Sequence, residues 1–142
     1  MPDRTSRTRF VPAPPEAIFD LLADPDKHAL IDGSGTVRAK RSGPDRLHLG
    51  ATFGVDMHHG LPYRMTNHVE EFEEGRRIAW RHFGRHRWRY ELEPVEGGTQ
   101  VTETFDTSHT PAPLRPIAKL MGRKNGESID ATLDRLVQHF SS

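Results

Sequence analysis

A long amphipathic segment at the C-terminal end of the sequence most constrains how this chain can fold. Between residues 114 and 140, apolar residues recur every three or four positions, as they do along one buried face of a helix. Such a helix is roughly 40 Å long at about 1.5 Å per residue, which is too long for the crossover of a small parallel unit. The sequence therefore predicts a sheet that wraps around this helix.

Short segments with alternating apolar and polar residues precede the helix and are separated by turn residues. They span residues 36–41, 52–57, 63–72, 77–83, 87–93 and 99–107, after an earlier strand over 5–11 and two short helices, one starting at Pro14 and one over 26–31. Short connections favour antiparallel neighbours. We predict an α+β fold: a curved antiparallel sheet of six to seven strands around the C-terminal helix, with two short helices after the first strand.

Length and composition predict one domain over residues 1–142 with a core that needs no disulfide, because the chain has no cysteine. No apolar stretch is long enough for a signal peptide or a membrane span, so we expect a cytoplasmic protein. Acidic and basic residues balance to a formal net charge of zero, which argues against a nucleic-acid partner, although local charged patches stay open.

Several segments, in order along nearly the whole chain, resemble the START-like (SRPBCC) superfamily and its polyketide cyclase/dehydrase group. They are residues 10–19, 22–25, 69–72 with 77–80, 88–92, 97–102 and 132–136. The resemblance implies a helix-grip fold with a deep, largely apolar cavity between sheet and helix. Members of this group bind lipids, polyketides, hormones or other hydrophobic molecules, and some catalyse cyclisation or dehydration. No catalytic motif of the family is present to carry over.

One face of the predicted strands carries the candidate ligand-binding residues, because ligand pockets of this kind are mostly apolar with a few polar groups. The candidates are Phe53, Val55, Met57, Tyr63, Met65, Asn67, Trp80, Trp88, Tyr90 and Phe105 on strands, with Met121 and Asn125 on the helix. For the aromatic residues, ordinary core packing is the alternative interpretation.

Glu103 and His82 are the candidate catalytic residues. Glu103 shares a strand face with Val101 and Phe105, so its carboxylate is expected to point into an apolar interior, where it could act as a general acid or base. A bulge that turns it to solvent is the alternative. His82 shares a face with Trp80 and could pair with Glu103, or it is a solvated histidine at a strand end.

Small and polar residues interrupt the apolar stripe in the middle of the long helix. Gly122, Asn125, Gly126 and Ser128 leave room for a ligand beneath the helix, or they mark a kink, a break or two shorter helices. We favour the first interpretation.

Other chemistries have weaker signals. His58 and His59 are adjacent in a predicted strand and point to opposite faces, so we expect no metal site, and no cofactor motif is present. Arginines alternate with aromatic residues between 76 and 90, and the acidic residues of 70–74 supply partners for them, so the pattern indicates a wet strand face rather than a nucleic-acid site.

Three functions are compatible with these sequence features. The first is binding or transport of a small hydrophobic molecule such as a lipid or polyketide. The second is a cyclase, dehydrase or aromatase in which Glu103 and His82 move protons and Tyr63 or Tyr90 steers an oxyanion. The third is a partner-binding domain that uses the outer sheet. A homodimer through an exposed strand edge stays open.

Overall fold

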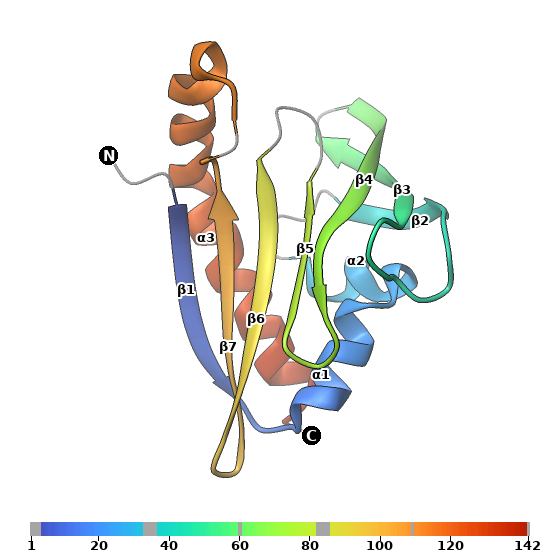
Figure 1. Cartoon of the computed structure of the whole chain (residues 1–142), viewed down its shortest axis with the longest axis vertical. Helices are drawn as coiled ribbons and strands as arrows, with labels where there is room; N and C mark the ends of the chain where they lie inside the picture. Colours follow the sequence, from blue (N-terminus) through green and yellow to red (C-terminus); the bar gives the residue numbers. More distant parts are fainter. Residues whose placement is uncertain (1–3, 33–36, 60, 82–85, 109, 142) are drawn as a thin grey trace.

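Seven strands form one curved antiparallel sheet (Figure 1). The computed structural model describes residues 4–32, 37–59, 61–81, 86–108 and 110–141, without the side chains of residues 37–42, 57, 59, 63, 64, 115 and 117–124. The strands are β1 (Arg4–Val11), β2 (Val37–Ser42), β3 (Thr52–His59), β4 (Leu61–Glu73), β5 (Arg77–Arg81), β6 (Arg87–Val95) and β7 (Gly98–Asp106). Their order is β1-β7-β6-β5-β4-β3-β2, so the predicted meander is confirmed and β1 completes it beside β7.

The helices are α1 (Pro15–Leu22), the short 3₁₀ turn η1 (Pro25–Lys27), α2 (His28–Ile31), the 3₁₀ turn η3 (Ala112–Leu114) and α3 (Arg115–His139). Proline in the first turn of α1 and of α3 suits a helix start, because its missing N–H has no partner there anyway. The Asp24 carboxylate accepts a hydrogen bond from the Asp26 backbone N–H at 3.0 Å and caps η1. No helix within the described ranges combines the length and apolar character needed to cross a bilayer.

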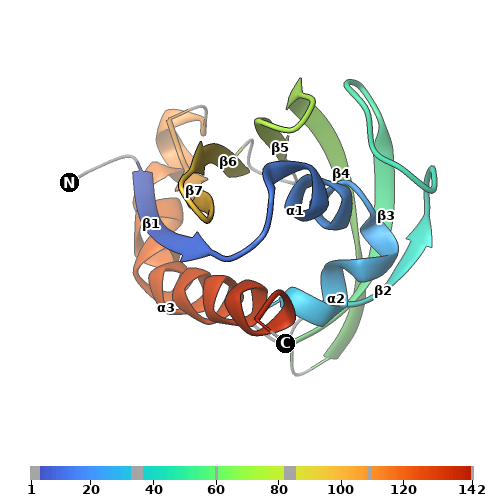
Figure 2. The same cartoon turned by 90° about the horizontal axis from the view of Figure 1, so that it is seen from below.

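Helix α3 lies along the inner side of β1 and also contacts β7 and α2 (Figure 2). Its buried face includes Ile129, Leu133 and Leu136, as the three-four spacing predicts. Two arginines on the inner side of β1 fasten the helix. Arg7 lies 3.4 Å from the Asp130 carboxylate, and Arg9 lies 3.5 Å from Asp130 and 3.3 Å from Asp134.

The middle of α3 is continuous, so a break into two shorter helices is wrong. Gly126 is buried against β1: a Cβ atom at this position would lie 3.0 Å from the Arg7 guanidinium and 3.5 Å from the Thr5 methyl group. At Gly126 the small residue therefore allows close packing of helix on strand, and the prediction that it leaves room for a ligand is wrong at this position.

An extra residue in β4 changes which side chains of this strand point to each face of the sheet. Val69 pairs with Trp80 and Glu71 with Ala79, so Glu70 is the added residue of a β-bulge. As a result, Val69 and Phe72 belong to the inner face, while both Glu70 and Glu71 belong to the outer face. Strict alternation would have sent these two neighbouring carboxylates to opposite sides.

The sheet has two unlike ends. The closed end is the end at which β4 ends and β5 begins. Helix α1 packs there: the centres of the Phe19 and Phe72 rings are 5.4 Å apart, and Ile78, Leu92 and Val101 are buried. The open end is the opposite end. The strand pairing shows that β3, β5 and β7 end there and that β4 and β6 begin there. Helix α3 begins at the open end (Figure 1).

Candidate functional site

A buried carboxyl group lies on the inner face of the sheet, at the centre of the apolar interior. Glu103 is only 3% exposed and pairs across the β6–β7 ladder with Tyr90, which is also buried. The Tyr90 hydroxyl donates a hydrogen bond to this carboxyl group, whereas Glu103 Oε1 has no partner among the described residues. The sequence prediction that Glu103 points inward is therefore correct, and no bulge turns it outward.

The protonation of this pair is shifted by its surroundings. Burial raises the pKa of Glu103 well above its usual range, and the nearby Asp32 charge raises it further, although the hydrogen bond from Tyr90 acts in the opposite direction. Burial and the negative charge of Glu103 likewise raise the pKa of Tyr90. The arrangement favours a neutral acid next to a neutral phenol, both of which can donate a proton or a hydrogen bond.

Aromatic rings form one wall beside this pair. The His28 ring stacks on Trp80 with ring centres 4.8 Å apart and planes 18° apart, and Phe53 meets both rings edge-on. Trp80 in turn lies 5.8 Å from Tyr90. His28 Nε2 forms a 2.8 Å hydrogen bond with the Leu22 carbonyl oxygen, and burial lowers the pKa of His28. This histidine is thus held neutral as part of an aromatic wall.

Toward the open end, the interior is less completely covered. Phe105 is buried between Trp88, at 4.8 Å, and His86, at 5.0 Å. Trp88 and Met65 belong to the inner face by their strand pairing, yet both are only partly buried. Inward-facing apolar side chains that still reach solvent mark this end as the side from which the interior is most accessible.

The structure brings together most of the residues that the sequence pattern selected. Buried on the inner face are Phe53, Val55, Asn67, Trp80, Tyr90, Glu103 and Phe105. Met65, Trp88 and Asn125 are partly buried. The side chains of Met57, Tyr63 and Met121 lie outside the described part of the chain, as does the whole of His82, so the proposed His82–Glu103 pair stays a prediction.

Three polar residues near this site were not predicted from the sequence: His28, Asp32 and His86. His28 and Asp32 come from the α2 segment, and only the tertiary fold brings them under the sheet. The sequence could have identified His86, because alternation places it on the same strand face as Trp88, Tyr90 and Leu92, which point inward. Burial lowers the pKa of His86 to about 4.

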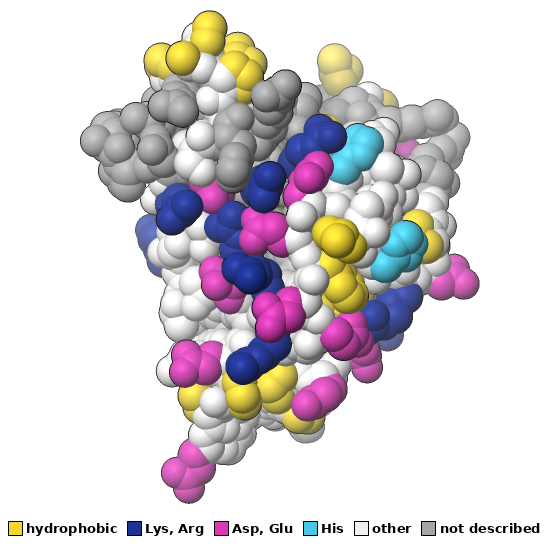
Figure 3. All heavy atoms as spheres, in the orientation of Figure 1, with side chains coloured by type: hydrophobic (Ala, Val, Ile, Leu, Met, Phe, Trp, Pro, Cys, Tyr) yellow, Lys and Arg dark blue, Asp and Glu magenta, His cyan; other side chains and the backbone are white. Residues whose placement is uncertain are grey.

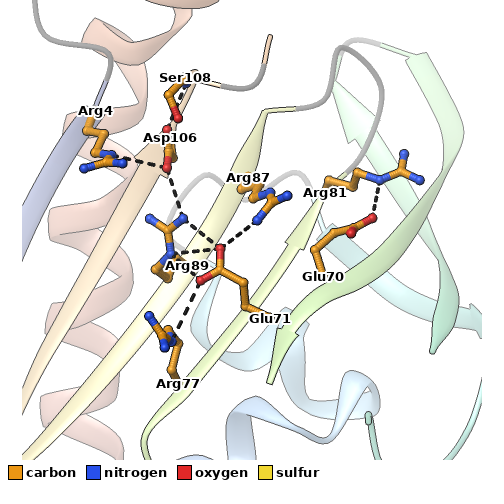
Figure 4. A network of polar contacts seen from close by, with 9 residues as sticks. All are labelled: Arg4, Glu70, Glu71, Arg77, Arg81, Arg87, Arg89, Asp106 and Ser108. Carbon is orange, nitrogen blue, oxygen red and sulfur yellow. Dashed lines mark hydrogen bonds and ion pairs between the residues drawn. The ribbon is translucent and has the colours of Figure 1, made fainter. Parts of the chain in front are cut away.

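The outer face of the sheet has different chemistry (Figure 4). Arg89 donates hydrogen bonds to Glu71 at 2.8 Å and to Asp106 at 3.0 Å, and Arg87 donates to Glu71 at 2.9 Å. Although burial alone would raise it, the pKa of Asp106 is lowered to about 2 by hydrogen bonds from Ser108 and Arg89. These arginines are thus engaged with carboxylates, as the sequence predicted, which leaves them poorly suited to bind phosphates.

A hollow of about 720 Å³ also lies on the outer face, between the β4–β5 turn and the middle of β6 and β7. Its lining mixes Arg76 and Arg77 with Glu73, Glu91 and Glu93, so no single charge dominates. Among the described residues, no group of three or more His, Asp or Glu side chains is arranged to hold a metal ion. We therefore place the candidate functional site on the inner face, around Glu103 and Tyr90.

Known proteins share this sequence pattern and fold. Residues 2–141 match a family described as polyketide cyclase / dehydrase and lipid transport. The chain is 37% identical over 147 residues to the uncharacterized protein Rv0088 of Mycobacterium tuberculosis H37Rv. That match covers 99% of this chain but 65% of the relative, so the chain spans just under two thirds of the length of this relative.

Solved structures with low sequence identity have the same fold. A crystal structure of a protein from Rhodobacter sphaeroides has a TM-score of 0.72 at 20% identity, covering 97% of this chain and 91% of that one. DynU16, described as a putative protein in the dynemicin biosynthetic locus, has a TM-score of 0.69 at 16% identity. This match covers the whole of the present chain and 48% of DynU16. The helix-grip fold predicted from the sequence is thereby confirmed.

Proposed function

The chain belongs to the polyketide cyclase/dehydrase and lipid transport family, and from this membership we propose that it binds a small hydrophobic molecule between the sheet and α3. The ligand enters at the open end, where Trp88 and Met65 reach solvent. It rests against the wall formed by Trp80 and Phe53. Aromatic walls with a few polar groups are typical of sites for apolar ligands.

The observation that carries this proposal is the unpartnered oxygen of Glu103. A polar atom buried in an apolar interior costs about 1–3 kcal/mol when it has no hydrogen-bond partner. Glu103 Oε1 is in this situation, in a carboxyl group whose other interaction is with Tyr90. A ligand carbonyl or hydroxyl that meets Oε1 removes that cost, so Glu103 and Tyr90 orient the polar end of a mostly apolar molecule.

Native mass spectrometry of the purified protein tests ligand binding directly, and quenching of the two tryptophans by an added hydrophobic dye tests it independently. We expect a co-purified small molecule and a saturable change in fluorescence. Glu103→Gln keeps a neutral polar group and should change dye affinity less than about threefold, whereas Glu103→Leu should weaken it about tenfold. Asp134→Asn, an exposed carboxylate on α3, serves as the matched control.

The binding proposal fails if neither measurement finds a bound molecule, or if Glu103→Leu and Asp134→Asn have equal effects. Circular dichroism of each variant shows whether the fold is retained, so loss of binding is distinguished from unfolding.

A second candidate function is catalysis of a cyclisation or dehydration, and the raised pKa of Glu103 favours it. A carboxyl group whose pKa is raised by burial keeps its proton to higher pH than an ordinary glutamate, which suits it as a general acid for a substrate carbonyl, and the Tyr90 hydroxyl can stabilise the oxyanion that develops there. If the protein is an enzyme, Glu103→Gln should abolish turnover of a polyketide substrate while dye affinity is kept. Equal turnover by wild type and Glu103→Gln would exclude this role.

A further inference from the structure

Two exposed apolar segments lie at the open end of the sheet. Leu61 and Pro62 begin β4 just after the β3–β4 turn, and residues 111–114 with Pro116 form the approach to α3. Leu61 is 74% exposed, the most of any large apolar residue described, and Leu114 is 45% exposed. Yellow apolar side chains accordingly protrude from this end in Figure 3, over the start of α3 and beside the β3–β4 hairpin. Leucines exposed in this way have no role in the core.

The segment that leads into α3 at this end of the molecule contains basic residues but no acidic ones. From Thr107 to Gly126 the chain contains four basic residues, Arg115, Lys119, Arg123 and Lys124, and no Asp or Glu. The whole chain has a formal net charge of zero, so this stretch is more basic than the rest of the sequence. Basic residues next to exposed aliphatic side chains suit the surface of an anionic bilayer, which attracts Lys and Arg and accepts apolar groups at its headgroup boundary.

We propose that the open end docks onto anionic lipid bilayers, with Leu61 and Leu114 inserted at the headgroup boundary and the basic start of α3 against the lipid phosphates. This inference rests on the proposed function in one respect: docking would bring the open end, where the ligand enters, to the surface from which an apolar ligand can leave the membrane.

A bilayer fits this surface better than a nucleic acid. Single-stranded nucleic acids are held by stacking on exposed aromatic rings, but the exposed apolar residues described at this end are leucine, proline and alanine, and the partly buried Trp88 belongs to the inner face. The arginines of the outer face, Arg87 and Arg89, are already bonded to Glu71 and Asp106 and do not extend the positive surface. Exposed aliphatic side chains contribute only where an apolar phase receives them.

The test is sedimentation of the purified full chain with vesicles of phosphatidylcholine alone and of phosphatidylcholine mixed with phosphatidylglycerol. We expect binding to the mixed vesicles at about 0.1 M salt, falling at least fivefold at about 0.5 M, because salt screens the attraction to anionic lipid. Leu61→Ser and Leu114→Ser should each weaken binding about fivefold, and the double variant should lose it.

Leu49→Ser is the matched control. Leu49 is 62% exposed but precedes the start of β3, at the other end of that strand from Leu61. Its substitution should leave vesicle binding unchanged. Docking is overturned if wild type does not sediment with the anionic vesicles, or if Leu49→Ser weakens binding as much as the other two variants. A salt-resistant association of the chain with itself that Leu61→Ser abolishes, without vesicle binding, would equally overturn it.

Failure of docking is separable from failure of the proposed function. Dye quenching in the absence of vesicles reports the interior, and we expect Leu61→Ser to bind dye as wild type does. A protein that binds dye but no vesicles keeps the proposed function and loses this inference.

Discussion

At the scale of single residues, the described part of the interior contains buried groups that can titrate, among them Glu103, His28 and His86. Each responds to burial by favouring its neutral form, since a charge in an apolar medium is costly. For Glu103 this raises the pKa, and for the two histidines it lowers the pKa. A neutral interior of this kind suits the apolar ligand that we propose, because no uncompensated charge would lie beneath it.

The lowered pKa values of His28 and His86 predict that these two residues destabilise the fold in mild acid. The unfolded chain binds a proton at each histidine below its ordinary pKa of 6.5, whereas folded His86 stays neutral down to its pKa of about 4. At these sites the unfolded state gains protons first, so each histidine lowers the free energy of unfolding as pH drops from about 6.5 toward 4, by at most about 1.4 kcal/mol per pH unit. Glu103, whose pKa is raised in the folded state, contributes in the opposite direction.

Urea unfolding at several pH values measures this effect. His86→Gln should flatten the pH dependence relative to wild type, and His28→Gln should do the same because its pKa is also lowered. His48→Gln, at an exposed histidine outside the interior, is the control for the loss of a histidine side chain. A pH profile that neither His86→Gln nor His28→Gln changes relative to wild type would contradict the buried neutral state of both rings.

At the scale of elements, close approach between backbones decides where glycine is needed. Gly98 at the start of β7 lies so near β1 that a Cβ atom there would be 2.3 Å from the Val11 carbonyl oxygen. Gly126 on α3 approaches the same strand, but its nearest neighbour is the end of the flexible Arg7 side chain. The first contact involves fixed backbone, while the second can adjust.

These two glycines should respond to alanine in opposite directions. Gly98→Ala must displace β1 and is expected to cost about 2 kcal/mol or more of unfolding free energy. Gly126→Ala removes the helix penalty of glycine and should stabilise by up to about 1 kcal/mol, because Arg7 can move by a few tenths of an ångström. Urea denaturation measures the free energy of unfolding of both variants. A Gly126→Ala variant that is less stable than wild type would mean that the Arg7–Asp130 ion pair holds Arg7 in place.

At the scale of the whole molecule, the sheet divides into a packed closed end and an accessible open end. Helix α1 fills the closed end with Phe19, Leu21 and Leu22, and Ile78 lies fully buried beneath it. At the open end no such helix covers Trp88 among the described residues, and its ring stays partly exposed. Stability and ligand binding should therefore depend on different ends of the same sheet.

Paired substitutions test this division. Ile78→Ala leaves a cavity in the closed end and should cost about 3 kcal/mol of unfolding free energy while dye affinity of the folded protein stays within about twofold. Trp88→Leu should cost about 1 kcal/mol, because its side chain is only partly buried, yet weaken dye binding about tenfold. Unfolding curves and quenching of the remaining Trp80 measure both quantities. Affinity losses that simply follow stability losses would contradict the division.

Much of this architecture could be predicted from the sequence because local rules apply to it. Three-four spacing predicted α3, period-two alternation predicted the inward side of Trp80, Trp88 and Glu103, and short turns predicted antiparallel neighbours. These patterns arise from the pitch of a helix and the pleat of a strand, which depend on neighbouring residues alone. The family resemblance extended them to the helix-grip fold.

Only the tertiary structure decided the contacts between distant segments. The bulge at Glu70 that turns two adjacent carboxylates to one face, the stacking of His28 on Trp80, and the use of Gly126 for packing against Arg7 all depend on which elements meet in space. Such contacts are set by the packing of elements far apart in the chain, where no local periodicity records the partner. The same is true of the hydrogen bond from Tyr90 to Glu103, since it requires the register of β6 on β7.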